Sequence, residues 1–290
     1  LMAGLQRRVS KGLADVSEEL GMPILVASHS SALIDDLSVH THRCSRRSDG
    51  SVCIEEVPTS DRDQLKKLGV PISEQLALYK VILLVEGLHE EVLLGEAFAN
   101  ELAEHRIRVV PMRGTRQMRL MAAEVDLLYQ HFDAPFVLLL DNTRSGPFRR
   151  AFEEIRSGQD LAEVRRTLAQ LDSPTDEEQV LRSILIKAID SGRIDRIAGV
   201  CGFSKTDIVE YLPCDHLVPG SESWAQLRQE HQDEVRSLKN RDFKRWLANS
   251  KDADFGTESL LNALDELNTV HDDWVELINY CIDIAQSRAG

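Results

Sequence analysis

Residues 81–91 read Val-Ile-Leu-Leu-Val-Glu-Gly-Leu-His-Glu-Glu, and residues 136–141 read Phe-Val-Leu-Leu-Leu-Asp. Each segment is an unbroken apolar run that ends at a carboxylate. Such a run, without alternating polar residues, is typical of a strand that is buried on both faces of a parallel sheet. Ligands of these sheets gather at the carboxyl ends of the strands. The two segments therefore predict a parallel sheet with acidic side chains gathered at one end.

The acidic residues around the first strand end have the spacing of a metal site. Gly87 lets the backbone turn tightly after Glu86, and a helix that begins at Leu88 places Glu90 in its first turn, facing the strand end. Asp141 follows the second strand. Carboxylate oxygens are suitable ligands for Mg²⁺ or Mn²⁺. We expect Glu86, Glu90 and Asp141 to hold one or two such ions.

Strands and helices alternate beyond this unit, which is typical of parallel βαβ architecture. We expect strands at Ile107–Pro111 and within Arg196–Phe203, and helices at Thr115–Gln130 and from Thr206, its N-cap, to Leu212. The sequence pattern predicts a helical insertion at residues 147–193 and a helical region at residues 221–290. The expected fold class is α/β, with a mostly parallel sheet flanked by helices, a helical insertion and a helical C-terminal subdomain.

The N-terminal part has weaker signals. The pattern predicts a helix over Leu5–Leu20 that stops at Gly21, a short buried strand at Ile24–Ala27, and a hairpin within residues 41–57. Asp61–Tyr79 is expected to form a helical connection.

The composition restricts the class of protein. The chain has 290 residues, a formal charge of −14 and five scattered cysteines without a Cys-x-x-Cys pair. The cysteine pattern indicates reduced thiols and a cytoplasmic protein. No apolar stretch approaches the length of a membrane span, so no membrane partner is expected. The negative charge argues against a surface that binds DNA over its whole extent, but a local basic strip could still guide a DNA backbone.

Glu86-Gly87-x-x-Glu90 with a later Asp141 resembles a TOPRIM domain, the metal-dependent fold of topoisomerases, primases and certain nucleases. The segment QLKKLGVPISEQLAL at 64–78 narrows the resemblance to the OLD (overcoming lysogenization defect) nucleases, which join an ABC-type ATPase to a TOPRIM domain. The segment PILVASHSSALIDDL at 23–37 resembles the end of that ATPase.

The resemblance implies a domain order and an activity. Residues 1–58 would be the C-terminal portion of the ATPase domain, and residues 59–79 would connect it to the TOPRIM domain. The TOPRIM domain would comprise residues 80–213, and residues 214–290 would form a helical C-terminal region. His29 would contact the ATP γ-phosphate region. No phosphate-binding loop occurs in the sequence, so we expect a fragment that does not hydrolyse ATP alone, with ATP serving only the full-length protein. DNA would be the substrate, and homo-oligomers would form through the ATPase region. The family suggests a role in phage defence.

The second acidic motif departs from the family pattern. TOPRIM domains usually carry Asp-x-Asp, whereas this chain has Asp141-Asn142-Thr143, followed by Arg144. The resemblance makes Asp207 or Glu210, in the segment after the last strand, candidates for the missing ligand. It also implies a catalytic lysine from the C-terminal helices, with Lys239 and Lys244 as candidates.

Arginines near the acidic segments are candidate phosphate contacts, with solvated helix faces as the alternative reading. They are Arg106, Arg108, Arg113, Arg116, Arg119, Arg144, Arg149 and Arg150, of which Arg113, Arg116, Arg144 and Arg149 are the predicted DNA contacts. The main expectation is a metal-dependent DNA endonuclease or nickase. The alternatives are a catalytically degenerate TOPRIM module that binds nucleic acid or a protein, and a fragment of a structural-maintenance type repair ATPase.

Overall fold

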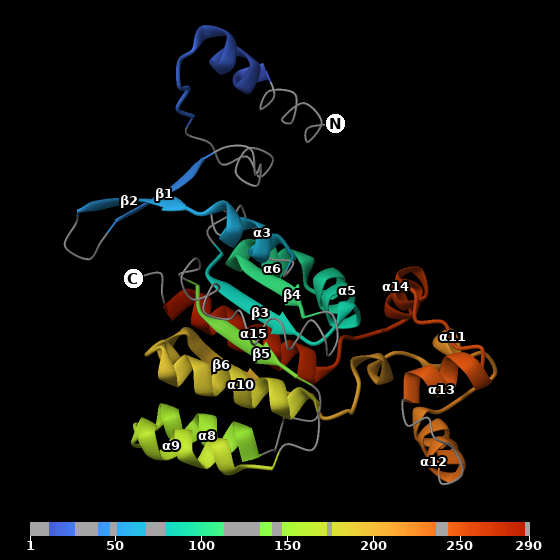
Figure 1. Cartoon of the computed structure of the whole chain (residues 1–290). Coiled ribbons are helices and arrows are strands. Elements are labelled where there is room, and N and C mark those ends of the chain that lie inside the picture. The colour runs from blue at the N-terminus through green and yellow to red at the C-terminus, as the bar shows by residue number, and fades with distance from the viewer. Residues whose placement is uncertain are drawn as a thin grey trace.

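The computed structural model describes residues 12–26, 40–46, 51–67, 79–112, 134–140, 147–172, 176–235 and 243–287 (Figure 1). Several predicted positions lie outside these residues, among them the predicted helix Thr115–Gln130. The site candidates outside them are His29, Arg113, Arg116, Arg119, Asp141, Thr143, Arg144 and Lys239.

The centre of the molecule is a four-stranded parallel sheet. It consists of β3 (Val81–Val85), β4 (Ile107–Pro111), β5 (Phe136–Leu139) and β6 (Ile197–Cys201), in the order β4-β3-β5-β6. Every residue of β3 and β5 is buried, because helices cover both faces of the sheet. The predicted parallel sheet and its strand positions are therefore confirmed.

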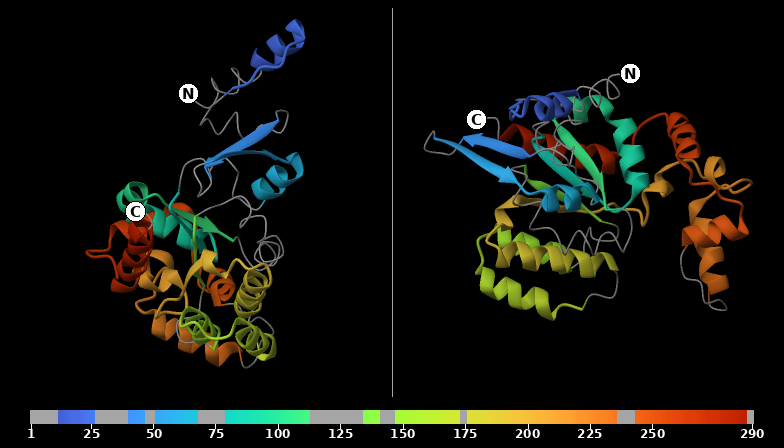
Figure 2. Two further views of the ribbon diagram at one scale, coloured as in Figure 1. Left: turned by 90° about the vertical axis from the view of Figure 1, so that its left-hand side faces the viewer. Right: turned by 45° about the horizontal axis from the view of Figure 1, so that its top comes forward.

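The two faces of the sheet are covered by helices from different parts of the chain. On one face, Ile82, Leu84 and their neighbours pack against α8 (Pro147–Arg156), α9 (Leu161–Gln170) and α10 (Asp176–Asp190). These three helices form the predicted insertion between β5 and β6. On the other face, Val81, Leu83 and Val85 pack against α5 (Leu88–Ala97), α6 (Ala99–His105) and α15 (Asp272–Ser287). Figures 1 and 2 show these layers.

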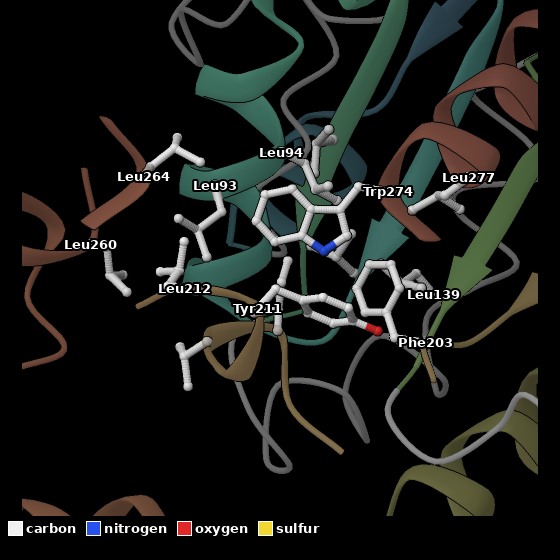
Figure 3. Close-up of a cluster of buried hydrophobic side chains, with 14 of the residues drawn as sticks. Leu93, Leu94, Leu139, Phe203, Tyr211, Leu212, Leu260, Leu264, Trp274 and Leu277 are labelled. Atoms are coloured by element: carbon white, nitrogen blue, oxygen red, sulfur yellow. The ribbon is translucent and has the colours of Figure 1, made fainter. Parts of the chain in front are cut away.

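The C-terminal helices extend the second hydrophobic core. They are α11 (Cys214–Leu217), α12 (Trp224–Val235), α13 (Phe243–Ser250), α14 (Thr257–Asp265) and α15. Leu260 and Leu264 of α14 approach Leu93 of α5, and Trp274 of α15 lies fully buried beside Tyr211 (Figure 3). The helical C-terminal subdomain is confirmed. In the described ranges, none of the helices combines the length and hydrophobicity that a membrane crossing requires.

The N-terminal segments include one wrong prediction. Residues 12–20 are helical and end at Gly21, whose φ of 60° is left-handed. Residues 24–26 are exposed coil instead of a buried strand, because no described strand pairs with them to satisfy their backbone. The hairpin is confirmed as β1 (Thr41–Arg46) paired antiparallel with β2 (Val52–Val57), followed by α3 (Thr59–Lys67).

The strand order identifies where this sheet is expected to bind a ligand. The chain passes from β3 to β4 at one side and then crosses to β5 at the other side of β3. The order reverses between β3 and β5, and open parallel sheets bind ligands at the carboxyl ends of such strands. Val85 and Leu139 are register partners at these ends. Glu86 follows Val85 directly, and Asp141 comes two positions after Leu139.

Candidate functional site

The turn after β3 buries one carboxylate at the start of α5. The helix begins at Leu88 as predicted, with Gly87 as its N-cap. The Gly87 N–H donates to Glu90 Oε2 at 2.8 Å, and Glu90 is 4% exposed. Gly87 has extended backbone angles, so the need for glycine comes from space: a Cβ there would lie 3.3 Å from Glu90 Oε2. Glu91 points elsewhere and lies 4.0 Å from Arg108.

A second carboxylate approaches from the segment after β6. Residues Ile208–Tyr211 form a 3₁₀ turn, η2, instead of the predicted α-helix. Its N-cap is Asp207 and not Thr206, because Asp207 Oδ1 accepts the Val209 N–H at 3.1 Å. The cap fixes the aspartate through one oxygen and leaves Oδ2 to face the neighbouring helices.

Lys244 of α13 joins these two segments. Its Nζ lies 2.6 Å from Asp207 Oδ2 and 2.9 Å from His89 Nδ1, although His89 is 155 residues away in the chain. The Asp207 side chain is 13% exposed and that of Lys244 is 30% exposed, so this is not a freely solvated surface pair. Helix α13 is held in place by Phe243, Trp246 and Leu247, which are buried in the second core.

Burial and charge change the acid–base properties of this cluster. Burial raises the pKa of Glu90, and Lys244 acts in the opposite direction. Burial, and then the charge of Lys244, lowers the pKa of His89 to about 4. His89 is therefore neutral at neutral pH, and its Nδ1 can accept a hydrogen bond from the Lys244 ammonium.

A network of hydrogen bonds fixes the segment that carries Asp207. Asp273, in the first turn of α15, accepts the Ser204 N–H, the Ser204 hydroxyl and the Tyr211 hydroxyl through its Oδ2. The ring of Tyr211 also packs edge-on against His271 and Trp274. Asp273 of α15 therefore ties Ser204, which precedes η2, to Tyr211, the last residue of η2.

Glu210 takes a different role from Asp207. Its Oε1 accepts hydrogen bonds from the Arg228 guanidinium, and Glu210 is 9% exposed. Arg228 also lies over the ring of Phe243, 3.8 Å from the ring centroid. Glu210 thus joins η2 to α12 and α13, whereas Asp207 forms the ion pair with Lys244.

The candidate ligands are carboxylate oxygens at a strand end, which are the donors that a hard divalent cation prefers. Burial raises the pKa of Glu90, so a bound cation would stabilise the charged form of this carboxylate. The described residues contain no group of three or more histidines, cysteines or acids that could hold a metal ion. A three-carboxylate site thus depends on Asp141, which lies outside them.

The predicted basic strip is only partly described. Arg149 of α8 forms an i,i+4 pair with Glu153 at 3.2 Å, and Arg108 faces Glu91. Arg106 adopts left-handed backbone angles at the end of α6. The DNA contacts assigned to Arg149 and to the undescribed arginines remain predictions.

His89 is the residue that sequence reasoning missed. The sequence motif gives His89 no role, because it stands between the motif positions Gly87 and Glu90. The structure instead half-buries it against Lys244, with its ring centroid 6.1 Å from that of Phe255. The available signal was its place in the first turn of the helix, next to Glu90, but its partner is distant in sequence.

The fold and the cluster together define an α/β protein with two carboxylates, a lysine and a histidine at the carboxyl end of a parallel sheet. No protein-family model matches the chain, and no curated protein matches it.

Among solved structures, the chain is similar to the C-terminal region of the Xanthomonas campestris pv. campestris OLD protein. That match has 14% identity and a TM-score of 0.33, and it covers 73% of this chain and 98% of the other. A second similar structure is the C-terminal region of the Burkholderia pseudomallei OLD protein, with 17% identity, a TM-score of 0.27, and coverage of 73% and 99%.

Proposed function

We propose that the chain carries a metal-dependent phosphodiesterase site that cleaves DNA. The observation that carries this proposal is the convergence of Lys244 with Asp207 and His89, next to the buried Glu90, at the carboxyl end of β3. The motif resemblance to TOPRIM nucleases implies the same chemistry, with Glu86, Glu90 and Asp141 as ligands and with Asp207 and Lys244 among the candidates, but it gives His89 no role.

Glu86, Glu90 and Asp141 are the residues that would hold the cation. When bound, a divalent cation supplies an activated water and stabilises the leaving oxygen. Glu90 is fixed by its bond from Gly87, so its carboxylate does not have to be ordered when a cation arrives. Glu86 follows β3 directly, at the end of the sheet where the strand order reverses between β3 and β5.

Besides a metal ion, the site would contain a positively charged side chain, that of Lys244. Asp207 and the neutral His89 hold its ammonium from two directions. A positioned ammonium stabilises the negative charge that develops on the phosphorus oxygens during hydrolysis. The lysine would act on DNA only if the phosphate replaces part of its contact with Asp207, so we expect DNA binding to weaken that pair.

Plasmid nicking in Mg²⁺ or Mn²⁺ tests the proposal, with EDTA as the blank. Glu86→Gln and Glu90→Gln should each lower the rate by at least roughly 100-fold, the scale of losing an essential electrostatic group. Glu91→Gln is the matched control, because Glu91 lies on the same turn and faces Arg108 instead. Full activity of both variants, or wild-type inactivity in both Mg²⁺ and Mn²⁺, would refute the proposal and favour a module that binds without cleaving.

A further inference from the structure

A cavity of about 300 Å³ lies at the outer edge of the sheet, apart from the Lys244 cluster. Its lining comes from β6 and the residues after it, from α8 and from α15. Because α8 and α15 cover opposite faces of the sheet, the cavity lies beside the edge strand β6. Gly199 to Phe203 line it, which places it toward the carboxyl end of β6.

The walls of this cavity are held by a fixed chain of contacts. Tyr280 of α15 donates its hydroxyl hydrogen to the Ala198 carbonyl at 2.6 Å, and Arg156 of α8 donates to the Tyr280 hydroxyl at 3.2 Å. A Cβ on Gly199 would lie 2.5 Å from the Tyr280 ring, so the ring rests directly on the strand backbone. The cavity is therefore preformed.

The residues that line the cavity suit a neutral, planar ligand that carries polar groups along its edge. Its apolar surface includes the ring of the half-buried Tyr280 and small parts of the rings of Phe152 and Phe203, which are otherwise buried. Three carboxylates, on Glu153, Asp273 and Glu276, outnumber the guanidiniums of Arg149 and Arg156, so the lining carries one net negative charge. This net charge favours a neutral group over a phosphate inside the cavity. A nucleobase is neutral, can stack on aromatic rings, and offers exocyclic amines to carboxylates.

The size and place of the cavity agree with a base from the cleaved strand. Ligand pockets begin near roughly 300 Å³, which suits a single base and excludes a duplex. The carboxyl end of β6 is two strand spacings from that of β3, roughly 10 Å, or about three nucleotides of a stacked strand. Asp273 lines the cavity and also bonds to Tyr211 of η2, the turn that Asp207 caps.

We propose that this cavity takes one unstacked base of the DNA strand whose backbone lies at the Lys244 cluster. This inference rests on the proposed function and narrows its substrate to single-stranded or locally unpaired DNA. The base would enter from the carboxyl end of β6, with one face toward the Tyr280 ring and its polar edge toward Glu276.

Binding without cleavage separates this inference from the proposed function. Fluorescence anisotropy in EDTA measures the affinity of a labelled single-stranded oligonucleotide and of its duplex. Glu276 is an exposed residue at the cavity, and Glu276→Trp would fill it. We expect roughly tenfold weaker binding of the single strand, the scale of losing one base–aromatic stack, and little change for the duplex.

Two variants separate charge from bulk. Glu276→Gln removes the charge without filling the cavity, so it should weaken binding of the single strand less than Glu276→Trp does. Asn279→Trp adds the same bulk at an exposed position of α15 outside the lining and should keep the wild-type preference for the single strand. A 5-iodocytosine oligonucleotide, whose base carries an exocyclic amine, should photo-cross-link to peptides that contain Phe152, Phe203 or Tyr280.

Several results would overturn the inference. These are equal losses for Trp at positions 276 and 279, no loss at either position, or cross-links confined to other peptides. Free nucleosides that bind as tightly as the single strand would assign the cavity to a soluble nucleoside and overturn its assignment to DNA. Wild-type protein that prefers single strands through this cavity but never nicks DNA would refute the proposed function and leave the base site standing.

Discussion

Replacing His89 by asparagine should change how the stability of the protein depends on pH. The folded protein lowers the pKa of His89 from 6.5 to about 4, mainly by burial and then by Lys244. In the unfolded chain the histidine has its ordinary pKa, so it binds a proton between about pH 6.5 and 4 while the folded protein does not. The unfolded state is then favoured as the pH falls, and wild-type stability declines across this window.

The size of this decline follows from the same numbers. One pKa unit corresponds to about 1.4 kcal/mol, so linkage over the interval from pH 7 to pH 5 gives a loss of roughly 2 kcal/mol for the His89 contribution alone. Asparagine keeps an acceptor oxygen near the position of Nδ1 but has no proton to bind in this range. The raised pKa of Glu90 acts in the opposite direction, but Glu90 is present in both proteins.

Urea unfolding of wild type and His89→Asn at pH 7, 6 and 5 measures this difference. We expect the difference between the two free energies of unfolding to change by roughly 2 kcal/mol between pH 7 and pH 5, because wild type loses stability that His89→Asn does not lose. His216→Asn removes an exposed histidine and is the control. If the difference between wild type and His89→Asn stays constant from pH 7 to pH 5, His89 is not the buried neutral partner of Lys244.

Three further changes have definite expected outcomes. Gly199→Ala should destabilise the protein by about 1–3 kcal/mol in thermal or urea unfolding, because its Cβ would lie 2.5 Å from the Tyr280 ring; unchanged stability would show that the ring yields freely. Glu210→Ala and Arg228→Ala should each lower stability by breaking the same buried pair, and the double variant should lose less than the sum of the two; additive losses would show that the pair is not coupled. Thr143→Asp should lower the Mg²⁺ concentration for half-maximal nicking by adding an anionic oxygen to a hard-cation site; no change would place the limiting ligand elsewhere.

The fold could be predicted from the sequence because its signals are local. An unbroken run such as Val81–Val85 needs helices on both faces, and strands that alternate with helical segments specify a parallel sheet. The exposed residues 24–26 show the limit of this reasoning. An apolar run predicts a buried strand only where neighbouring strands complete its hydrogen bonds, and the pattern itself does not show whether they do.

The candidate site was predictable where its residues belong to one turn. Gly87, Leu88 and Glu90 have the predicted arrangement, because capping depends on residues three positions apart. Lys244 came only from the family resemblance, and His89 was missed, since their contact joins α5 to α13 across the fold.

The choice between Asp207 and Glu210 also needed the structure. Both are acids in the same short segment, and only their neighbours distinguish them: Asp207 caps η2 and faces Lys244, whereas Glu210 faces Arg228. The domain boundaries and the ligand role of Asp141 stay predictions.

The most direct test of the central claim compares two lysines that are alike except for their place. Lys244 pairs with Asp207 at 2.6 Å, and Lys251, just after the same helix α13, pairs with Glu230 at 2.6 Å with similar exposure. The measurement is the rate of plasmid nicking in Mg²⁺ and Mn²⁺, alongside the thermal stability of each variant. We predict that Lys244→Met loses nicking by at least roughly 100-fold while remaining folded, and that Lys251→Met keeps wild-type nicking. Equal rates for the two variants would contradict the claim that the Lys244 cluster is where the phosphodiester is cleaved.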